Sequence, residues 1–484
     1  MSEAAAGAPS EHTYDVVVLG GGPVGVALAG RARSAALSVV VVEKELVGGE
    51  CQYRACVPSK ALLRPVIAVA DARRVEGARA AVNAPLDAAA AFARRDGFVF
   101  HWTDDPPVGL LKGWGAELVR GHGRLDGSRR VAVETLNDGR VVLSARHAVA
   151  VCTGSRAALP DLPGITEARP WISRDATSAS TVPERLAIVG GGGVGVEMSS
   201  AYRGLGASVT LLVRDARLLP EMEPFVGEVV VRGLVEAGVD VRTGVTVTGL
   251  SRPGGTGPVT MLLDDGGELE ADEVLFAIGR VPLTDDIGLE TVGLTPGSWL
   301  EVDCTCRVRA INDGWLYALG DVNHHAILTH QGKYQARIVG DAIAARAAGR
   351  PLDTAPWGAH ATTADFHAVP RVFFCDPEAT AVGLSAEQAE RAGYRVRAVD
   401  VEIGQVDGAN LYADGYRGRA RMVVDLDHGC LFGVTFVGPG VAELLHSATV
   451  AVAGQVPIDR LWHVVPCYPS ISEVWLHLLE AYRS

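Results

Sequence analysis

Residues 14–25 decide the fold class, and they read Tyr14-Asp15-Val16-Val17-Val18-Leu19-Gly20-Gly21-Gly22-Pro23-Val24-Gly25. An alanine-rich stretch follows, and the apolar run 37–42 predicts a second strand. Strand, glycine cluster, helix and strand in this order are typical of a dinucleotide-binding unit. Gly20, Gly22 and Gly25 would permit a tight turn and the close approach of a pyrophosphate to the helix N-terminus. The stretch therefore predicts an α/β chain that begins with a Rossmann-like unit.

The same pattern returns in the middle of the chain. The apolar run 186–189 is followed by Gly190, Gly192 and Gly195, and then by a helix that should end near Leu205. A strand is expected at 209–213. The chain is thus expected to contain two Rossmann-like nucleotide-binding domains.

Two cysteines stand in the run Gly48-Gly49-Glu50-Cys51-Gln52-Tyr53-Arg54-Ala55-Cys56-Val57-Pro58-Ser59-Lys60. The Cα atoms of a disulfide lie roughly 4.4–6.8 Å apart, whereas residues five apart in a regular helix are separated by about 7.5 Å along its axis. Cys51 is therefore expected on an irregular turn, which Gly48 and Gly49 permit, and Pro58 suits the first turn of the helix. A helix N-terminus favours the thiolate. The pair is interpreted as a reversible redox disulfide, with a structural disulfide or two buried thiols as the alternatives.

This cysteine run resembles the redox centre of the pyridine nucleotide–disulfide oxidoreductases, which include dihydrolipoamide dehydrogenase, glutathione reductase and mercuric reductase. The resemblance covers roughly residues 13 to 480. Further stretches that match are 151–155, 277–282, 317–321, 376–378 and 437–440.

The resemblance also implies a domain organisation. Residues 14–167 and 300–362 would form an FAD-binding domain, 168–299 an inserted NADPH-binding domain, and 363–484 a mixed α/β dimerisation domain. Residues 1–13 are expected to be a disordered tail, because they lack the apolar stretch of a signal peptide.

Cofactor assignment follows from the ends of the second strands. Glu43 ends the strand of the first unit, where a carboxylate accepts hydrogen bonds from a ribose diol, so this unit suits the AMP half of FAD. The corresponding position in the second dinucleotide-binding element is Val213. Arg214 follows it, and Arg217 lies three residues further on. Without the acid and with two guanidinium groups nearby, the second unit is expected to prefer NADPH, although Arg214 could be an ordinary solvated side chain.

Three further positions are implied to contact the cofactors. Gly154 and Asp321 lie in stretches that resemble FAD-binding elements, and Gly279 lies in one that resembles the end of the NADPH domain. Asp321 would bind the ribityl chain, or could cap the helix that starts after it.

The family resemblance assigns roles to the reactive residues. Electrons would pass from NADPH to FAD, then to the disulfide, then to substrate. Cys56 would face the flavin and Cys51 would attack substrate. Lys60 resembles the lysine near flavin N5, and Glu197 resembles its carboxylate partner. A structural ion pair is the alternative for Lys60 and Glu197.

The C-terminal segment departs from the family pattern. Members such as lipoamide dehydrogenase carry a histidine as acid–base for the thiols across the dimer interface, followed by a glutamate. Here Tyr468 occupies the histidine position and Glu473 matches the glutamate. A tyrosine, with an ordinary pKa near about 10, is a poor base at neutral pH. Ordinary disulfide reduction is therefore in doubt, and Cys467 is interpreted as a buried core thiol rather than a third reactive one.

Other chemistry-bearing residues are not assigned to a site. The adjacent His324 and His325 lack a ligand set of suitable spacing, so they are expected to be solvated or packed, and no metal is expected. Cys304 and Cys306 alternate on a probable strand and are expected to be two unlinked thiols.

Composition limits the function classes. The 484 residues are 48% hydrophobic and 21% charged, with a formal net charge of −13 and a pI near 5.5. This negative charge argues against nucleic acid and anionic membranes as partners. Eight cysteines are too few for a disulfide scaffold over this length, and no stretch suits a membrane span, so a soluble cytoplasmic protein is expected. The family resemblance implies that it forms a homodimer.

Three functional hypotheses remain open. The first is an NADPH- and FAD-dependent enzyme that uses Cys51 on a disulfide or thiol-bound substrate, with mercuric-reductase-like or carbon–sulfur-cleaving chemistry as variants. The second is a quinone reductase or diaphorase that uses FAD directly. The third is a non-catalytic flavoprotein subunit, against which the intact cysteines, Lys60 and Glu197 argue.

Overall fold

The computed structural model describes residues 10–135 and 139–484. The chain divides into two units. The first unit contains the chain up to Cys56 together with Val99–Arg156 and Arg280–Asp365, and the second contains Val57–Phe98, Ala157–Gly279 and Phe366–Ser484. The division into three domains inferred from the sequence stays a prediction.

The first unit contains the N-terminal βαβ element. Its main strands are β1 (Ser10–Leu19), β2 (Val39–Glu43), β3 (Glu117–Leu125), β4 (Arg130–Thr135), β5 (Arg140–Val151) and β15 (Leu316–Ala318). β1 pairs in parallel with β2 and β5, β2 pairs with β3, and β5 pairs with β15, while β4 lies antiparallel to β3 and β5. The valines of β1 are fully buried, as expected for a parallel strand covered on both faces. β1 begins at Ser10, inside the predicted tail, whose residues 1–9 lie outside the described part of the chain.

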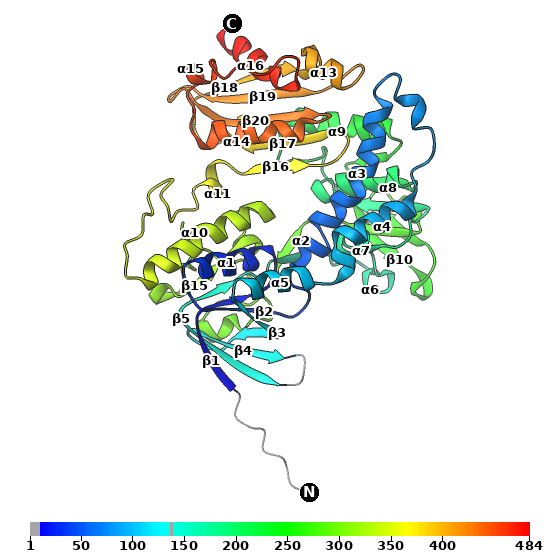
Figure 1. The fold of residues 1–484 in the computed structure, drawn as a ribbon. Coiled ribbons are helices and arrows are strands. Elements are labelled where there is room, and N and C mark those ends of the chain that lie inside the picture. The colour runs from blue at the N-terminus through cyan, green and yellow to red at the C-terminus, as the bar shows by residue number, and fades with distance from the viewer. Residues whose placement is uncertain (1–9, 136–138) are drawn as a thin grey trace. The chain divides into compact units, whose positions relative to one another are not determined.

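The helices of this unit cover its sheet. They are α1 (Pro23–Ser34), α2 (Gly49–Tyr53), the start of α3 (Cys56–Arg73), α5 (Asp105–Gly113) and α10 (Thr329–Ala347), with α11 (Ala364–His367) at its last residues. Pro23 is the first residue of α1, where the missing N–H costs no hydrogen bond. α1 and α10 lie side by side in Figure 1 and both contact the sheet. The short strands β6 (Ser155–Ala157) and β14 (Arg280–Pro282) pair with each other.

The second unit begins with helices and the second βαβ element. Its helices before the C-terminal sheet are most of α3, α4 (Ala88–Phe98), α6 (Ile165–Ala168), α7 (Ser173–Ser178), α8 (Gly193–Gly204) and α9 (Pro224–Glu236). The parallel strands β13 (Glu273–Phe276), β7 (Arg185–Val189), β8 (Ser208–Val213) and β9 (Asp240–Thr243) form one sheet in that order. An antiparallel sheet contains β10 (Val247–Ser251), β11 (Val259–Leu263) and β12 (Glu268–Ala271).

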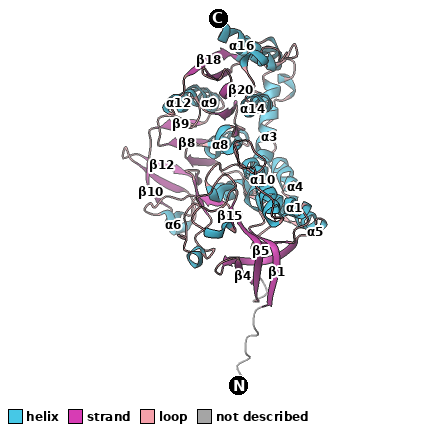
Figure 2. Cartoon of the chain, turned by 90° about the vertical axis from the view of Figure 1, so that its left-hand side faces the viewer, coloured by secondary structure: helices cyan, strands magenta, loops and turns pink. Residues whose placement is uncertain are grey.

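The C-terminal part of the same unit is an antiparallel sheet with helices. Its order is β16 (Pro370–Phe373), β17 (Glu378–Gly383), β20 (Leu431–Gly438), β19 (Arg419–Asp425) and β18 (Val396–Glu402). Its helices are α12 (Ala386–Arg391), α13 (Asp407–Tyr412), α14 (Leu445–Ala453), α15 (Ile458–Leu461) and α16 (Val474–Arg483). Figure 2 shows α14 beside β20, and α14 packs on β17 and β20.

The predicted fold class is confirmed, because two Rossmann-like βαβ elements and a C-terminal mixed α/β region are present. Both predicted glycine clusters lie between a buried parallel strand and a helix, and their second strands end at Glu43 and Val213. Within the described residues, no helix is both long and apolar enough to cross a membrane.

Candidate active site

The first glycine cluster forms the tight turn that its sequence predicts. Gly20 has φ +100°, and a Cβ on Gly25 would lie 2.0 Å from the Gly20 carbonyl oxygen, so no side chain fits at that point of α1. The backbone N–H of Gly21 donates to Glu43 Oε2 at 2.7 Å. Burial raises the pKa of the Glu43 carboxyl, and hydrogen bonds from the Glu45 and Gly21 backbone N–H groups partly offset this effect.

The space around this cluster fits a dinucleotide. A Cβ on Gly22 or on Gly154 would meet no atom within 4 Å, so both glycines border open space. Thr153 Oγ1 is buried, and it has no hydrogen-bond partner among the described residues. Open glycine backbone and an unsatisfied hydroxyl are what a bound pyrophosphate or flavin would use. The residues present therefore fit FAD.

Asp321 belongs to a polar cluster of the first unit. It lies in the 3₁₀ turn Gly320–Asn323, and its carboxylate accepts a hydrogen bond from Ser155 Oγ. Arg280 donates to Ser155 Oγ at 2.6 Å and lies 3.1 Å from Glu50 Oε2. Helix α10 starts only at Thr329, and its N-cap, Leu328, provides no side-chain hydrogen bond. The alternative of Asp321 as the cap of that helix is therefore wrong.

The two cysteines lie on either side of a helix break. Cys51 lies in the five-residue helix α2, Cys56 is the first residue of α3, and Arg54 between them has φ −131°. Gly48 and Gly49 have φ of +114° and +61°, which supports the predicted irregular backbone before Cys51. Pro58 is the third residue of α3, as predicted. The two sulfurs are not bonded to each other in this structure.

The cysteine run contacts the first glycine cluster. A Cβ on Gly49 would lie 2.7 Å from the Gly22 Cα, so the start of α2 packs directly on the turn that begins α1. The backbone N–H of Gly48 donates to the Gly21 carbonyl at 2.8 Å. The first unit therefore holds its cysteine pair next to its nucleotide fingerprint.

Thr329, the first residue of α10, contacts this pair. Its hydroxyl donates to Cys51 Sγ at 2.9 Å and lies 3.5 Å from Cys56 Sγ. The pKa of the Cys51 thiol is raised, because it is hydrogen-bonded to Cys56 and buried, while Thr329 and Lys333 act in the opposite direction. No sequence signal pointed to Thr329, which is 278 residues from Cys51.

Lys60 and Glu197 form an ion pair within the second unit. Lys60 Nζ lies 2.6 Å from Glu197 Oε2, and the two side chains are 36% and 7% exposed. Glu197 Oε1 accepts a hydrogen bond of 3.0 Å from the Phe374 backbone N–H. Lys60 Nζ also lies 5.3 Å from the centre of the Phe374 ring, a cation–π distance. The predicted pairing of Lys60 with Glu197 is thus present, and its role in catalysis stays a prediction.

The second glycine cluster is built like the first. A Cβ on Gly195 would lie 1.8 Å from the Gly190 carbonyl oxygen, and one on Gly192 would meet no atom within 4 Å. Gly279, which follows β13, has φ +135° and also borders open space. The residues of this turn fit a second dinucleotide.

The two clusters differ at the end of the second strand. A Cβ on Gly191 would lie 2.7 Å from a methyl carbon of Val213, whereas the corresponding Gly21 meets the Glu43 carboxylate. Arg214 follows Val213 with a side chain 78% exposed, and its Nε lies 3.6 Å from Asp215. Arg217 donates to the Pro220 carbonyl at 3.3 Å. This edge of the second unit thus has an apolar contact and two nearby guanidinium groups.

Tyr468 lies on the surface of the chain. Its side chain is 72% exposed, and its hydroxyl donates to Asp407 Oδ2 at 3.2 Å. That hydrogen bond and the negative charge of Asp407 raise the pKa of the Tyr468 hydroxyl above its ordinary value. Glu473 ends a 3₁₀ turn, and its Oε2 is buried without a hydrogen-bond partner among the described residues. The structure therefore provides Tyr468 as a hydrogen-bond donor rather than as a base.

Three interpretations of cysteines need correction or comment. Cys467 is exposed, so its reading as a buried core thiol is wrong. Cys304 and Cys306 lie in a turn rather than on a strand, and only Cys306 is buried. They are not linked to each other, as predicted.

The adjacent histidines pack against other side chains. His324 stacks on Trp299 with ring centres 4.3 Å apart, and His325 Nδ1 lies 3.5 Å from Asp365. Across residues 10–135 and 139–484, no group of three or more His, Cys, Asp or Glu side chains is placed to hold a metal ion.

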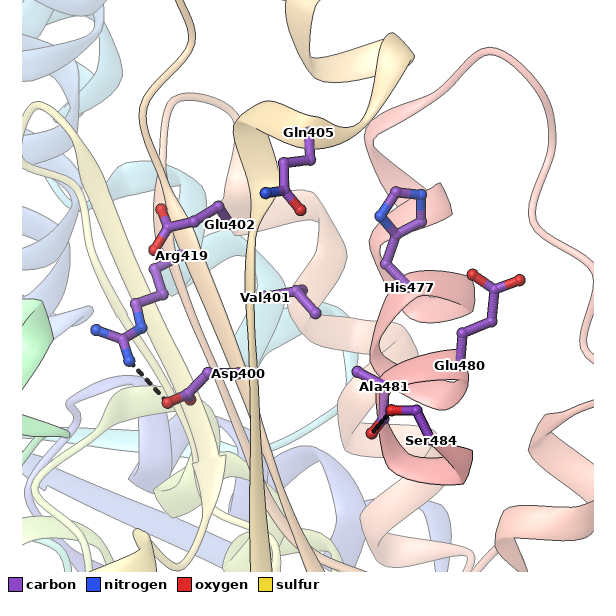
Figure 3. A pocket seen from close by; sticks show the side chains of 9 residues that line it. All are labelled: Asp400, Val401, Glu402, Gln405, Arg419, His477, Glu480, Ala481 and Ser484. Carbon is purple, nitrogen blue, oxygen red and sulfur yellow. Dashed lines mark hydrogen bonds and ion pairs between the residues drawn. The ribbon is translucent and has the colours of Figure 1, made fainter.

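A surface pocket of about 530 Å³ lies in the second unit, and none of the predicted site residues lines it. Figure 3 shows its lining, in which Arg419 donates to Asp400 at 2.7 Å and His477 projects from α16. The lining residues are Asp400, Val401, Glu402, Gln405, Arg419, His477, Glu480, Ala481 and Ser484.

Comparison with known proteins identifies relatives over nearly the whole chain. A sequence model described as pyridine nucleotide-disulphide oxidoreductase matches residues 14–349, and one described as the dimerisation domain of the same group matches residues 369–479. The chain is 31% identical to the dihydrolipoyl dehydrogenase of Thermus scotoductus, with 97% of each chain covered. It is 29% identical to the mercuric reductase of Staphylococcus aureus, with 95% of this chain and 81% of the relative covered.

A solved structure shares the fold. The Cu(II) complex of the HOCl-induced flavoprotein disulfide reductase RclA from Escherichia coli superposes with a TM-score of 0.82 at 22% identity, over 97% of this chain and 99% of that one.

Proposed function

Because this chain belongs to the pyridine nucleotide–disulphide oxidoreductase family, we propose that it transfers electrons from NADPH through FAD and the Cys51–Cys56 pair to a disulfide or a thiol-bound substrate. The family makes the chain a flavoprotein oxidoreductase with a disulfide redox centre, and its dimerisation domain supports a homodimer. The NADPH preference and the kind of substrate are the proposed part.

The contact between Gly49 and Gly22 carries this proposal. It fixes the start of the cysteine run against the glycine turn that fits FAD, so the pair and the nucleotide fingerprint are parts of one packed element. FAD, when bound, accepts a hydride and passes electrons singly or in pairs. Cys56 would face the flavin and Cys51 would face substrate, as the family resemblance implies.

Lys60 and Glu197 are proposed to adjust the charge near the flavin. A lysine whose ammonium is held by a buried carboxylate keeps a fixed position and a positive charge. Such a charge would stabilise reduced, anionic flavin. The second hydrogen bond of Glu197, from Phe374, restricts the rotation of the carboxylate and so the position of Lys60.

NADPH is proposed as the electron donor because of the strand end at Val213. A carboxylate at this position would bind a 2′-hydroxyl and repel a 2′-phosphate, whereas Val213 does neither. Arg214 is exposed and available to bind the phosphate in bidentate fashion. The similarity to dihydrolipoyl dehydrogenases does not identify the nicotinamide nucleotide that donates electrons to this chain, because the name of these relatives mentions none.

The substrate class is proposed from Tyr468. Its hydroxyl can donate a hydrogen bond but holds its proton above neutral pH, so thiol–disulfide exchange with ordinary disulfides should lack an acid–base group. A thiol-bound metal ion needs no such proton transfer at the thiols, and one relative is a mercuric reductase. We therefore propose that the substrate is a thiol-bound metal ion or an activated disulfide, and that oxidised lipoamide and glutathione disulfide are poorer substrates.

Turnover of purified protein with NADPH tests this function. The substrates would be oxidised lipoamide, glutathione disulfide, mercuric and cupric salts with excess thiol, and a quinone. Loss of activity in Cys51→Ser with disulfide or metal substrates, but not with the quinone, is expected. Equal turnover of all acceptors by Cys51→Ser would instead show a diaphorase that reduces acceptors directly from FAD.

A further inference from the structure

One hydroxyl group contacts both sulfurs of the redox pair. Thr329 is the first residue of α10, and its Oγ1 lies 2.9 Å from Cys51 Sγ and 3.5 Å from Cys56 Sγ. The shorter contact is a hydrogen bond from the hydroxyl to Cys51. A threonine has one donor hydrogen, so it can donate fully to only one sulfur at a time.

The charges around Cys51 come from three helices. On α3, the Cys56 thiol is hydrogen-bonded to Cys51, and a thiolate at Cys56 would disfavour a second thiolate at Cys51. From α10, Lys333 lies one turn after Thr329 and favours the thiolate. From α2, the carboxylate of Glu50 is paired with Arg280 at 3.1 Å. Thr329 and Lys333 are thus the groups that favour a thiolate at Cys51.

We propose that Thr329 is a further catalytic residue, whose hydroxyl stabilises whichever sulfur of the Cys51–Cys56 pair carries negative charge. This rests on the proposed function and adds to it a donor within the same chain, where Tyr468 stands at the position of the acid–base histidine. In the reduced pair, the hydrogen bond to Cys51 favours the thiolate that attacks substrate. The proposal needs no imidazole and no movement of the backbone.

The electron and bond balance is simple for a disulfide substrate. The Cys51 thiolate attacks one substrate sulfur, the substrate S–S bond breaks, and the other substrate sulfur leaves as a thiolate. The Cys56 thiolate then attacks Cys51 Sγ, the Cys51–Cys56 disulfide forms, and the second substrate thiolate leaves. Once Cys51 is a neutral mixed disulfide, the Thr329 hydroxyl can turn from Cys51 to Cys56 by rotation about one bond.

Alkylation of the reduced protein tests this role without turnover. The protein is reduced with dithiothreitol, freed of the reductant, and treated with iodoacetamide over a pH series, and modification of Cys51 is followed by mass spectrometry. Thr329→Val keeps the shape and removes the donor. A hydrogen bond to a charged group is worth enough to shift a pKa by about one to two units. The apparent pKa of Cys51 is therefore expected to rise by that amount.

Thr329→Ser is the matched control, because it keeps the hydroxyl and should retain a pH profile close to that of the unchanged protein. Lys333→Gln should raise the apparent pKa of Cys51 less than Thr329→Val, and added salt should reduce its effect, since Lys333 is exposed. Thr329→Ala provides a second donor-free variant in case Thr329→Val binds FAD poorly, which the flavin absorbance would report.

A pH profile of Cys51 that is the same in Thr329→Val, Thr329→Ala and the unchanged protein would overturn the proposal. So would a Thr329→Ser profile that matches the valine variant. Alkylation uses neither NADPH nor substrate. If Thr329→Val shifts the apparent pKa of Cys51 as expected but the protein turns over no disulfide or metal substrate, the proposed function is refuted and the role of Thr329 is not.

Discussion

Lys60 Nζ lies 2.6 Å from Glu197 Oε2, although 137 residues separate the two in the sequence. The carboxylate is 7% exposed and also accepts the Phe374 backbone N–H. A nearly buried carboxylate costs free energy unless it is paired, so each of the two donors is needed by Glu197. The pair is therefore expected to be sensitive to loss of either charge.

Removal of the negative charge should slow flavin reduction. Glu197→Gln keeps an acceptor for the Phe374 N–H but leaves Lys60 without its counter-charge, so the ammonium is expected to lose its fixed position. Loss of one preorganised group that stabilises developing negative charge typically costs roughly 10²–10³-fold in rate, and a decrease of up to this size is expected here. The measurement is the stopped-flow decay of oxidised-flavin absorbance with NADPH. Lys60→Arg, which keeps the charge, is the control, and an unchanged rate in both Glu197→Gln and Lys60→Met would show that the pair is only structural.

The assignment of the two sulfurs predicts a difference in colour. The unchanged protein should develop a long-wavelength charge-transfer band when stoichiometric NADPH reduces the disulfide. Cys51→Ser, which has no disulfide to reduce, should show the band before NADPH is added and lose it when the flavin is reduced, whereas Cys56→Ser should show no such band. The reason is that only the sulfur facing the flavin can donate charge to it. Anaerobic absorbance titration checks this outcome. A band that persists in Cys56→Ser and disappears in Cys51→Ser would reverse the assignment.

The strand end at Val213 predicts a preference for NADPH. One or two charge-assisted hydrogen bonds to a 2′-phosphate are each worth about 1.5–3 kcal/mol, so kcat/KM with NADPH should exceed that with NADH by roughly tenfold or more. Arg214→Ala should reduce this ratio, while the rate with NADH stays close to unchanged. Arg217→Ala serves as the comparison, because its guanidinium already donates to the Pro220 carbonyl. Equal kcat/KM values for the two nucleotides would contradict the preference.

Tyr468 predicts slow reduction of small disulfides. The neighbouring Asp407 raises the pKa of the Tyr468 hydroxyl, which therefore stays protonated through neutral pH and should produce no break in a pH–rate profile below about pH 10. A general acid–base is typically worth about 10²–10⁴-fold. Tyr468→His should recover part of this factor if Glu473 orients the ring.

Steady-state turnover of oxidised lipoamide by the unchanged protein, Tyr468→His and Tyr468→Phe checks this prediction. Tyr468→Phe is expected to differ little from the unchanged protein with this substrate. Fast turnover by the unchanged protein would mean that another group supplies the proton.

Local sequence patterns predicted the nucleotide-binding elements well. Tyr14–Gly25 and the second glycine cluster specify a buried strand, a tight turn and a helix, and these features depend on residues that are close together in the chain. The predicted end of the second strand at Glu43 is confirmed, with the carboxylate on the Gly21 N–H. The irregular backbone at Gly48 and Gly49 could also be predicted, because positive φ favours glycine.

Alternation and residue type predicted the secondary structure and the burial of cysteines less well than the glycine motifs predicted the nucleotide-binding elements. Cys304 and Cys306 alternate as on a strand, but this segment forms a turn instead. The Asp303 side chain stabilises the turn by accepting hydrogen bonds from the backbone N–H and the hydroxyl of Thr305. Such local side-chain hydrogen bonds compete with a strand ladder. Residue type alone predicts a buried Cys467, but Cys467 is exposed and lies in a segment where Tyr468 and Val465 are also exposed.

The two nucleotide fingerprints, the cysteine pair and the candidates for the ion pair can be recognised without a structure, since each belongs to a short motif of neighbouring residues. Two sets of contacts follow instead from the packing of the folded chain: the Thr329 hydroxyl contacts both sulfurs, and Arg280 contacts both Ser155 and Glu50. These contacts join segments more than a hundred residues apart. No short pattern encodes them, because they form only when separate strands and helices pack their buried faces together.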